Sequence, residues 1–376
     1  MPDDPTMPAR LHLGGRSVSV VGRARIYVCG VTPYDVTHLG HAATFVWVDA
    51  AERVLRRLGV QVEVCRNVTD VDDVLFDAAS RAGAHYDRFA AVQQFHFEQD
   101  MDALAVRRPA HEPSAHTFVP QVVALAAALL EADAAYLAGG SVYFSGTHVA
   151  GSHGLLRDEA LILLAGNGGH NDDPNKRDPL DQAVWQAADP EAGGGQPSWP
   201  SPWGPGRPGW HAECTAMALS TYGPSMDLHA GGADLRFPHH AYESAQAEAA
   251  TGVTPFARSW LHVGTVRLDG EKMAKSTGNL VFVSDLSRQS SGPVVRTLLL
   301  DRRYATPWDY SSAVLEQAGV RLDALRVAAG RQAGLESASQ AVLDALIDDL
   351  DVPRALDVAI EEGGQAARDL ISILAL

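Results

Sequence analysis

The chain has 376 residues, of which 46% are hydrophobic and 20% are charged, and its formal net charge is -16. This length predicts about two or three packed units, and no apolar run approaches the roughly 18 residues of a membrane span, which excludes a transmembrane protein. The acidic charge disfavours a nucleic-acid binder that depends on a general basic surface. The acidic start lacks a signal-peptide pattern, so a cytoplasmic protein without membrane contact is expected. Three cysteines are too few for a disulfide framework.

The first predicted elements form a strand, a helix and a second strand. After a loose leader, residues 24–31 are apolar and rich in β-branched side chains, as in a buried strand. Helical spacing follows from Thr37 and stops at Gly59, and VQVEVCRNVT then returns to alternation. Such a unit implies a parallel sheet that binds its ligand at the carboxyl ends of the strands, here residues 29–41 and 66–73.

The middle of the chain is predicted to be an inserted subdomain. Residues 120–138 show helical spacing, and GGSVYFSG is typical of a strand between glycines. Residues 165–208 are crowded with Gly, Pro, Asn and Asp, which favours ordered loops or a mobile flap. Further along, residues 209–223 and 239–252 have helical periodicity, residues 259–270 alternate like a strand of a second sheet segment, and the chain beyond about residue 290 is almost entirely helical.

Two separate groups of basic side chains suit a phosphate ligand. His38 and His41 lie three residues apart at the head of the first helix, where backbone N–H groups and the helix dipole bind anions and imidazoles can stabilise a phosphoryl transition state. Lys272 and Lys275 lie on a loop that begins with glycine, as expected of mobile cations that close over a triphosphate. Either group alone would more often be an ordinary solvated surface.

Taken together, the histidine pair and the lysine loop match the two signatures of class I aminoacyl-tRNA synthetases. Five segments resemble, in order, the cysteine-activating members of that class. They are CGVTPYDVTHLGHAATF (29–45), RNVTDVDD (66–73), GWHAEC (209–214), GGADLRFPHH (231–240) and KMAKS (272–276). The resemblance covers roughly residues 24–375 and is greatest to the mycothiol cysteine ligases, which join cysteine to the amine of glucosaminyl-inositol. PSWPSPWGPGRPGWH, DDLDVPRALDVA and the early end of the chain favour that group.

The resemblance implies an α/β fold. A Rossmann-type parallel sheet catalytic domain of the class I synthetases would be split over residues 20–115 and 200–285. An inserted subdomain would occupy residues 116–199, and a C-terminal helical bundle residues 286–376. The implied enzyme is an ATP-dependent ligase that makes cysteinyl-adenylate from L-cysteine and magnesium-bound ATP and releases pyrophosphate. An amine then displaces AMP to form an amide.

Cysteine and histidine side chains predict a metal site. Cys29, Cys214 and His239 offer soft and borderline ligands suited to zinc. Their spacing alone would favour Cys29 as a small buried hydrophobic residue, and the motif match reverses that interpretation. In the family the zinc ion binds the thiolate of the substrate cysteine, which serine imitates poorly, so one Zn²⁺ per chain is implied. Glu243, on the same helical face as His239, is either a fourth ligand, a carboxylate that supports the site, or exposed. Cys65 has no such context and is expected in the core.

The resemblance also assigns residues to the adenylate. Thr32 and Thr69 would contact its cysteinyl part, and Trp210 would close over it. Trp210 could equally be a core aromatic, and Asp234 a helix cap. The acidic run Asp70, Asp72 and Asp73 lacks the pattern of a calcium loop, so a loop lining the pocket is expected. The remaining assigned residues are Gly232 and Asp234 along the ribose, Thr44 near the nucleotide, the backbone of Val266 against adenine, and Gly30, Val31, Asn67 and Ala233 around them.

Two departures from the family pattern leave the acceptor open. Ala274 replaces a serine of the lysine loop, and residues 165–172 read AGNGGHND where the mycothiol ligases carry a charged segment. Another amine acceptor in specialised metabolism is therefore an alternative, as is a non-catalytic cysteine-sensing or scaffold protein. A tRNA-charging enzyme is disfavoured, since the -16 charge opposes tRNA and the 100 residues after Ser276 leave little room for an anticodon-binding region.

Overall fold

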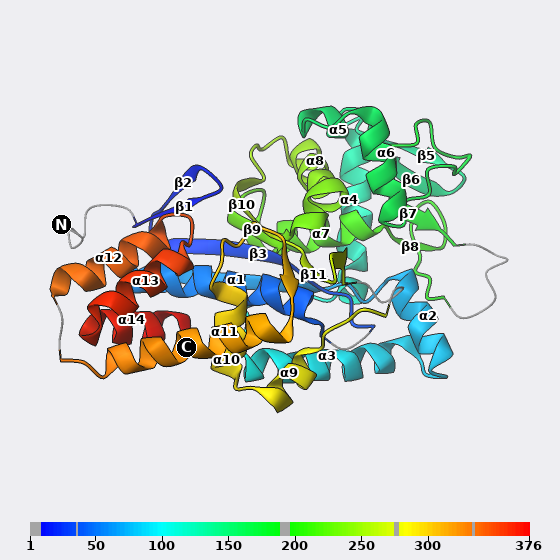
Figure 1. Cartoon of the computed structure of the whole chain (residues 1–376). Coiled ribbons are helices and arrows are strands. Elements are labelled where there is room, and N and C mark those ends of the chain that lie inside the picture. The colour runs from blue at the N-terminus through cyan, green and yellow to red at the C-terminus, as the bar shows by residue number, and fades with distance from the viewer. Residues whose placement is uncertain (1–8, 35–36, 189–195, 274–277, 333–334) are drawn as a thin grey trace.

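The computed structural model describes residues 9–34, 37–188, 196–273, 278–332 and 335–376. Ala274 and Lys275 of the lysine loop lie outside these residues. The chain forms an elongated molecule with a central sheet, an inserted part at one end and a helical C-terminal part at the other (Figure 1). Among the described residues, no helix combines the length and the apolar character required to span a bilayer.

The centre of the molecule is a four-stranded parallel sheet with the order β10-β9-β3-β4. The two strands that come first in the chain, β3 and β4, and the helix α1 between them match the predicted strand, helix and strand. The third strand, β9, was not predicted, because MDLHAGG lacks a continuous apolar run. The strand predicted over residues 259–270 is divided between β10, which joins this sheet, and β11 (Val266–Leu268), which belongs to a separate three-stranded sheet. The elements are β3 (Arg23–Val31), α1 (Leu39–Arg57), β4 (Gln61–Val68), β9 (Met226–Gly232), α8 (Ala241–Thr251) and β10 (Ala257–Val263).

The two faces of the sheet are covered by different helices. Successive side chains of a strand point to opposite faces. Ile26 and Val28 of β3 therefore join the hydrophobic cluster built around α1. Tyr27 and Cys29 join a second cluster with residues of α7 (Trp210–Tyr222), which covers the other face (Figure 1). This alternation turns the thiol of Cys29 toward α7.

The inserted part contains a second sheet, antiparallel, with the order β5-β6-β7-β8. Two predictions are wrong here. The helix expected to reach residue 138 ends at Glu131, because the chain turns at Asp133, where φ is 53°. Residues 135–138 of the predicted helix instead form a strand that pairs with β6. The stretch expected to be loop or flap holds two strands of this sheet. The elements are η1 (Ala115–Thr117), α4 (Val119–Glu131), β5 (Ala135–Ala138), β6 (Ser141–Phe144), α5 (Val149–Ser152), α6 (Arg157–Gly166), β7 (Gln182–Ala187) and β8 (Gly206–Pro208).

The segment before the first sheet strand is structured where it is described. The prediction of a loose leader is wrong for residues 9–20, which form a hairpin whose inward side chains, such as Leu11 and Val18, are buried in the main core. The hairpin consists of β1 (Ala9–Leu13) and β2 (Arg16–Val20), and two further helices, α2 (Asp73–Arg81) and α3 (Tyr86–Ala103), follow β4.

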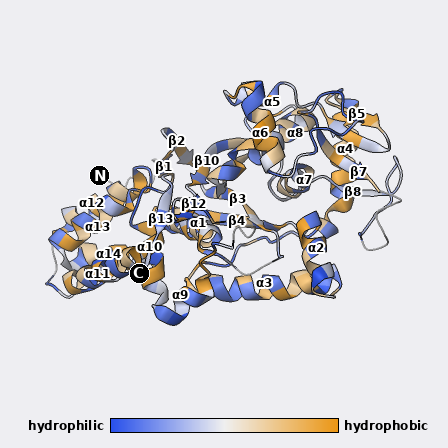
Figure 2. Cartoon of the chain, turned by 45° about the vertical axis from the view of Figure 1, so that its right-hand side comes forward, coloured by the Kyte–Doolittle hydropathy of each residue, from blue (hydrophilic) through white to orange (hydrophobic). Residues whose placement is uncertain are grey.

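The C-terminal part is largely helical, as predicted. Hydrophobic and hydrophilic residues alternate along its helices, as expected of helices that bury one face (Figure 2). Its apolar residues and those of α1 and the parallel sheet form one continuous core, and the predicted domain boundaries stay a prediction. The elements are β11 (Val266–Leu268), β12 (Glu271–Lys272), α9 (Val283–Gln289), α10 (Gly292–Leu300), β13 (Trp308–Tyr310), α11 (Ser312–Ala329), α12 (Glu336–Ile347), α13 (Val352–Glu362) and α14 (Gly364–Leu374).

A buried arginine joins the helical part to α1. Arg296 of α10 is 0% exposed and donates to Oδ2 of Asp49 at 2.7 Å. It also donates to the carbonyl oxygens of Leu104 and Leu374, at 2.8 and 2.9 Å. A buried charge is tolerated only when its hydrogen bonds are made, so this residue fixes how α1, α10 and α14 meet.

Replacement of Arg296 should therefore destabilise the whole fold. Arg296→Ala leaves Asp49 buried without one of its cationic partners, and we expect the free energy of unfolding to fall by about 3 kcal/mol. The matched control is Arg288→Ala, because Arg288 pairs with Asp285 on the surface and its loss should cost less than about 0.5 kcal/mol. Urea denaturation of the two variants measures both values. Equal losses of unfolding free energy in the two variants would show that the buried Arg296–Asp49 pair stabilises the fold no more than a surface pair does.

Candidate active site

Four buried side chains meet on the α7 side of the parallel sheet. Cys29 lies two residues before the end of β3, Cys214 lies in α7, His239 lies in η3 (Arg236–His240), and Glu243 lies in the first turn of α8. One ligand atom from each lies within 4.8 Å of the others, and all four side chains are buried. Two sulfur atoms, an imidazole nitrogen and a carboxylate oxygen form a donor set for a transition metal of borderline softness. The cluster can hold a metal ion.

The acidic groups of this cluster share one buried space with a basic one. Burial raises the pKa of Cys214, but the hydrogen bond with Cys29 and the charge of His239 outweigh it and lower that pKa to about 7. Burial lowers the pKa of His239, but the carboxylate of Glu243 and the thiolate of Cys214 raise it to about 10. The protonated imidazole of His239 is therefore the cation that balances the Glu243 carboxylate and stabilises the thiolate of Cys214; a bound metal ion would take over that role and require the neutral imidazole as its ligand.

Glu243 lies inside the cluster rather than on an exposed surface. Its Oε1 accepts from Sγ of Cys29 at 3.2 Å and lies 2.9 Å from Nε2 of His239. Its Oε2 lies 2.9 Å from Nε2 of His229, and the side chain is 0% exposed. The exposed alternative for Glu243 is excluded. Its carboxylate either ligates the metal or holds the ligands in place.

Sequence reasoning missed the other histidines around this cluster. His229 and His240 form a second group with Cys29 and Glu243 whose ligand atoms also lie within 4.8 Å of one another. Nδ1 of His211 lies 2.9 Å from Nδ1 of His239. The signal was present in the sequence, since His211, His229 and His240 all stand in or beside the motifs that carried the resemblance, but only the fold turns them toward the candidate metal ligands.

A cavity of about 670 Å³ lies at the carboxyl ends of all four parallel strands and includes the cluster in its wall. This is the place where parallel sheets bind their ligands. Val31, Ala233 and Glu243 do not line the cavity directly, and Lys275 lies outside the described residues. The other predicted site residues line it, namely Cys29, Gly30, Thr32, His38, His41, Thr44, Asn67, Thr69, Trp210, Cys214, Gly232, Asp234, His239, Val266 and Lys272.

The two motif histidines stand together at the start of α1. His38 is the N-cap residue, and its Nδ1 accepts from the backbone N–H of Gly40 at 3.1 Å. The rings of His38 and His41 are stacked with their centroids 3.9 Å apart. Both rings therefore line the cavity beside the positive end of a 19-residue helix, which is an arrangement that suits a phosphate.

Lys272, the last residue of β12, also lines this cavity. Its Nζ lies 2.6 Å from Oδ2 of Asp234, and both side chains are substantially exposed. An ion pair this exposed stabilises the protein little and can be exchanged for another partner at small cost. Asp234 is thus an ion-pair partner here, rather than the helix cap that the sequence left open as its alternative role.

The backbones of β3 and β4 approach each other closely beside the cavity. A Cβ atom on Gly30 would stand 1.7 Å from the carbonyl oxygen of Asn67, so only glycine fits there. The side chain of Asn67 accepts from the N–H of Gly30 at 2.8 Å and donates to Sγ of Cys214 at 3.2 Å. The hydroxyls of Thr32 and Thr69 lie 2.7 Å apart. These contacts fix the distance between β3 and β4.

Trp210 is only partly buried, so the alternative that it is a core aromatic residue is wrong. Its ring stacks on the imidazole of His239, with the centroids 4.2 Å apart and an interplanar angle of 21°. It starts α7 and lines the cavity directly above the metal-ligand candidates.

The acidic run after β4 does not line the cavity, contrary to expectation. Asp70 pairs with His116, Asp72 caps α2 by accepting from the N–H of Val74, and Asp73 forms an ion pair with Arg207. These carboxylates hold α2 and the inserted part in place, and only the flanking Thr69 and Val74 reach the cavity.

Comparisons with known proteins agree with this geometry. The family model described as tRNA synthetases class I (C) catalytic domain matches residues 17–320. Among solved structures, methionyl-tRNA synthetase of Mycobacterium tuberculosis in complex with methionyl-adenylate aligns with 94% of this chain and 82% of its own, with a TM-score of 0.61. At 16% identity this likeness concerns the fold alone. The predicted class I synthetase fold is confirmed.

Relatives identify the branch of the family. The L-cysteine:1D-myo-inositol 2-amino-2-deoxy-alpha-D-glucopyranoside ligase of Frankia alni is 43% identical over 93% of this chain and 87% of its own. The protein of the same name from Streptomyces griseus is 44% identical over 92% of this chain and 87% of its own. The chain therefore belongs to the class I cysteinyl-tRNA synthetase-like family, in its branch of mycothiol cysteine ligases. The predictions of this family and of an ATP-dependent ligase are confirmed.

The metal-binding role of the cluster can be tested with two cysteine variants. Cys214→Ser replaces a soft ligand by a poor one and should lose most of the metal bound per chain. Cys65→Ser makes the same change at a cysteine that is equally buried but outside the cluster, and should keep the metal content of the parent protein. Elemental analysis by mass spectrometry after exhaustive dialysis measures both. Full metal content in Cys214→Ser would remove it from the ligand set.

Proposed function

We propose that this protein activates L-cysteine with magnesium-bound ATP and joins the resulting cysteinyl-adenylate to the amine of glucosaminyl-inositol, releasing AMP. The observation that carries the proposal is that one cavity is lined both by the cysteine-and-histidine cluster and by the histidine pair at the start of α1. A thiol-binding group and a phosphate-binding group are thereby within reach of one small ligand. The names of the ligase relatives support the choice of cysteine and of the amino sugar.

Cysteine would be recognised through its thiol. Cys29, Cys214 and His239 would hold one Zn²⁺, with Glu243 either as a fourth ligand or as the group that holds the others, and the ion when bound supplies a Lewis acid for the substrate sulfur. Serine is close to cysteine in size, so packing alone would discriminate poorly between them. Thr32 and Thr69 would contact the amino-acid part of the adenylate, and Trp210, stacked on His239, would cover it and exclude water.

ATP would lie with its phosphates at the start of α1. His38 and His41 would donate to the phosphate oxygens, assisted by the N–H groups of the first turn. Lys272 would exchange its exposed pair with Asp234 for the triphosphate, and Lys275, which lies outside the described residues, would join it. The nucleoside would extend along the strand ends over Gly30, Thr44, Asn67, Gly232, Asp234 and the backbone of Val266. Val31 and Ala233, which do not line the cavity directly, would support their neighbours Gly30 and Gly232.

The reaction would proceed in two displacements. A carboxylate oxygen of cysteine attacks the α-phosphorus, and the bond from that phosphorus to the pyrophosphate oxygen breaks. Charge builds up on the phosphoryl oxygens, where His38, His41 and the two lysines lower its energy. The acceptor amine next attacks the acyl carbon, the bond from that carbon to the phosphate oxygen breaks, and AMP leaves with the electron pair.

Loss of one motif histidine should affect activation rather than binding. His41→Ala removes a donor to the transition state, so the rate of cysteine-dependent exchange between pyrophosphate and ATP should fall roughly 100-fold, while the KM for cysteine changes little. His96→Ala, on the exposed side of α3, is the matched control and should behave like the parent protein. An unchanged exchange rate in His41→Ala would refute its phosphate role.

The complete function can be tested with purified protein, magnesium-ATP and cysteine. AMP release should be sustained only when glucosaminyl-inositol is added, and mass spectrometry should detect the cysteinyl amide. Serine in place of cysteine should give neither product. Pyrophosphate formation without amide would point to another amine, transfer to tRNA would support the charging enzyme, and cysteine binding without pyrophosphate would indicate a scaffold protein.

A further inference from the structure

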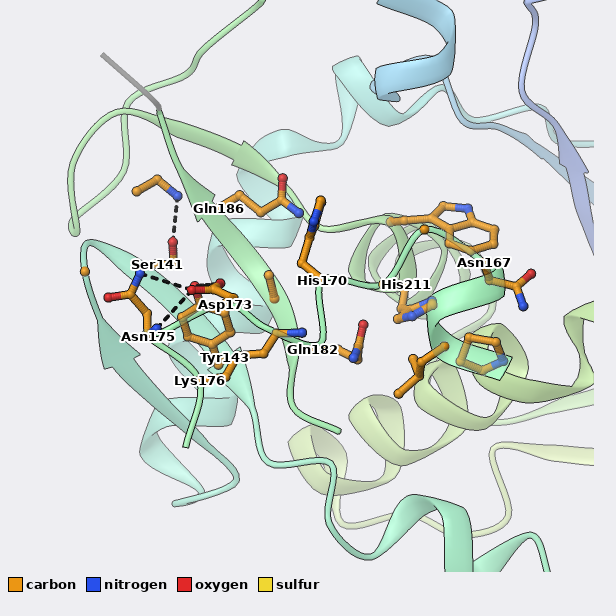
Figure 3. A pocket seen from close by; sticks show the side chains of 18 residues that line it. Ser141, Tyr143, Asn167, His170, Asp173, Asn175, Lys176, Gln182, Gln186 and His211 are labelled. Atoms are coloured by element: carbon orange, nitrogen blue, oxygen red, sulfur yellow. Dashed lines mark hydrogen bonds between the residues drawn. The ribbon is translucent and has the colours of Figure 1, made fainter. Parts of the chain in front are cut away.

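A second cavity, of about 500 Å³, lies in the inserted part of the chain. Its walls come from β6, β7, the start of α7 and the segment that follows α6 (Figure 3). Apart from Trp210, no residue to which a role is assigned above lines this space. Its size falls within the range of roughly 300–1,000 Å³ that small-molecule sites occupy.

The second cavity adjoins the first. Trp210 lines both of them. Gly166, the last residue of α6, lines the first cavity, and the next residue along the chain, Asn167, lines the second. A ligand in the second cavity therefore ends against the side chain that would cover the cysteinyl group.

The lining of the second cavity suits hydroxyl groups. The described lining residues include the carboxylate of Asp173, the amides of Asn175, Gln182 and Gln186, and the imidazole of His170. Such side chains offer donors and acceptors in fixed directions, which is what a polyol requires. Lysine occurs once among these residues and arginine does not, so the cavity is poorly matched to a polyphosphate or to a nucleic-acid strand.

The carboxylate of Asp173 is held in a fixed and ionised state. Its Oδ2 accepts from the hydroxyl of Tyr143 at 2.6 Å, and its Oδ1 accepts from the backbone N–H of Asn175 at 2.9 Å. Partial burial raises the pKa of Asp173, but these hydrogen bonds outweigh it and lower that pKa below its ordinary value. In Figure 3 this group lies at the side of the cavity opposite to His211, the residue that follows Trp210.

We propose that the second cavity binds the acceptor as a polyol that carries one amine, with its hydroxyls toward Asp173 and Asn175 and its amine toward Trp210. This inference rests on the proposed function. In this position the neutral amine forms its bond to the acyl carbon of the adenylate, the bond from that carbon to the phosphate oxygen breaks, AMP takes the electron pair, and the extra proton on nitrogen passes to water. Residues 167–170, part of the segment that departs from the family pattern, would then set which amino sugar is accepted.

The experiment compares two variants with a control. His170→Ala and Asp173→Asn alter the cavity lining, and His170 is exposed, so its loss should not endanger the fold. Asp172→Asn makes the same chemical change one residue away, on an exposed side chain that does not line the cavity. For each protein, amide formation is measured over a range of glucosaminyl-inositol concentrations, and cysteine-dependent exchange between pyrophosphate and ATP is measured without acceptor.

We expect the KM for glucosaminyl-inositol to rise roughly tenfold or more in Asp173→Asn and several-fold in His170→Ala, because each loses a hydrogen bond to the acceptor. The exchange rate should stay within about twofold of the parent protein in all three variants, and Asp172→Asn should leave both measurements unchanged. If the parent protein forms the amide and both lining variants keep its acceptor KM, the second cavity is not the acceptor site. If the parent protein exchanges pyrophosphate but forms no amide with this sugar, the proposed function itself fails, and the assignment of this sugar fails with it.

Discussion

The structure depends on the burial of Cys29, Cys214, His239 and Glu243 in one place. Groups that carry charge are costly to bury unless they compensate one another, so this cluster restricts everything that packs around it. The alternation of β3 turns Cys29 toward α7, and α7 in turn presents Cys214 from its second turn. His239 and Glu243 come from the far side, where η3 runs into α8. Three separate segments of the chain, namely β3, α7 and the continuous η3 and α8, are thus fixed by one set of contacts.

In the proposed function, that constraint would also place recognition and reaction in one cavity. The cluster lies at the carboxyl end of β3, and the helix that follows this strand begins with the histidine pair. A substrate held by its sulfur atom at the strand end would then have its carboxylate directed toward the histidine pair. Positioning of this kind can account for a large part of a catalysed rate, because the reacting atoms no longer have to meet by diffusion.

Sequence periodicity was a sound guide wherever a single segment determines its own structure. The strand, helix and strand at the start and the helices at the end were predicted because their apolar residues repeat with a clear period. Strand β9 was missed because histidine and glycine interrupt it, and β5 was taken for helix because it is rich in alanine. The ring of His211, His229 and His240 around the ligands could not be predicted, because the distances between them are set by tertiary packing. The second cavity was not predicted for the same reason, since its walls come from separate parts of the chain.

The most direct test of this account is zinc K-edge X-ray absorption on the zinc-loaded protein, recorded alone, with cysteine and with serine. We expect two sulfur ligands, from Cys29 and Cys214, in the protein alone, one additional sulfur ligand when cysteine is added, and no change with serine. A spectrum that does not change on addition of saturating cysteine would contradict the central claim that this cluster selects the substrate through its thiol.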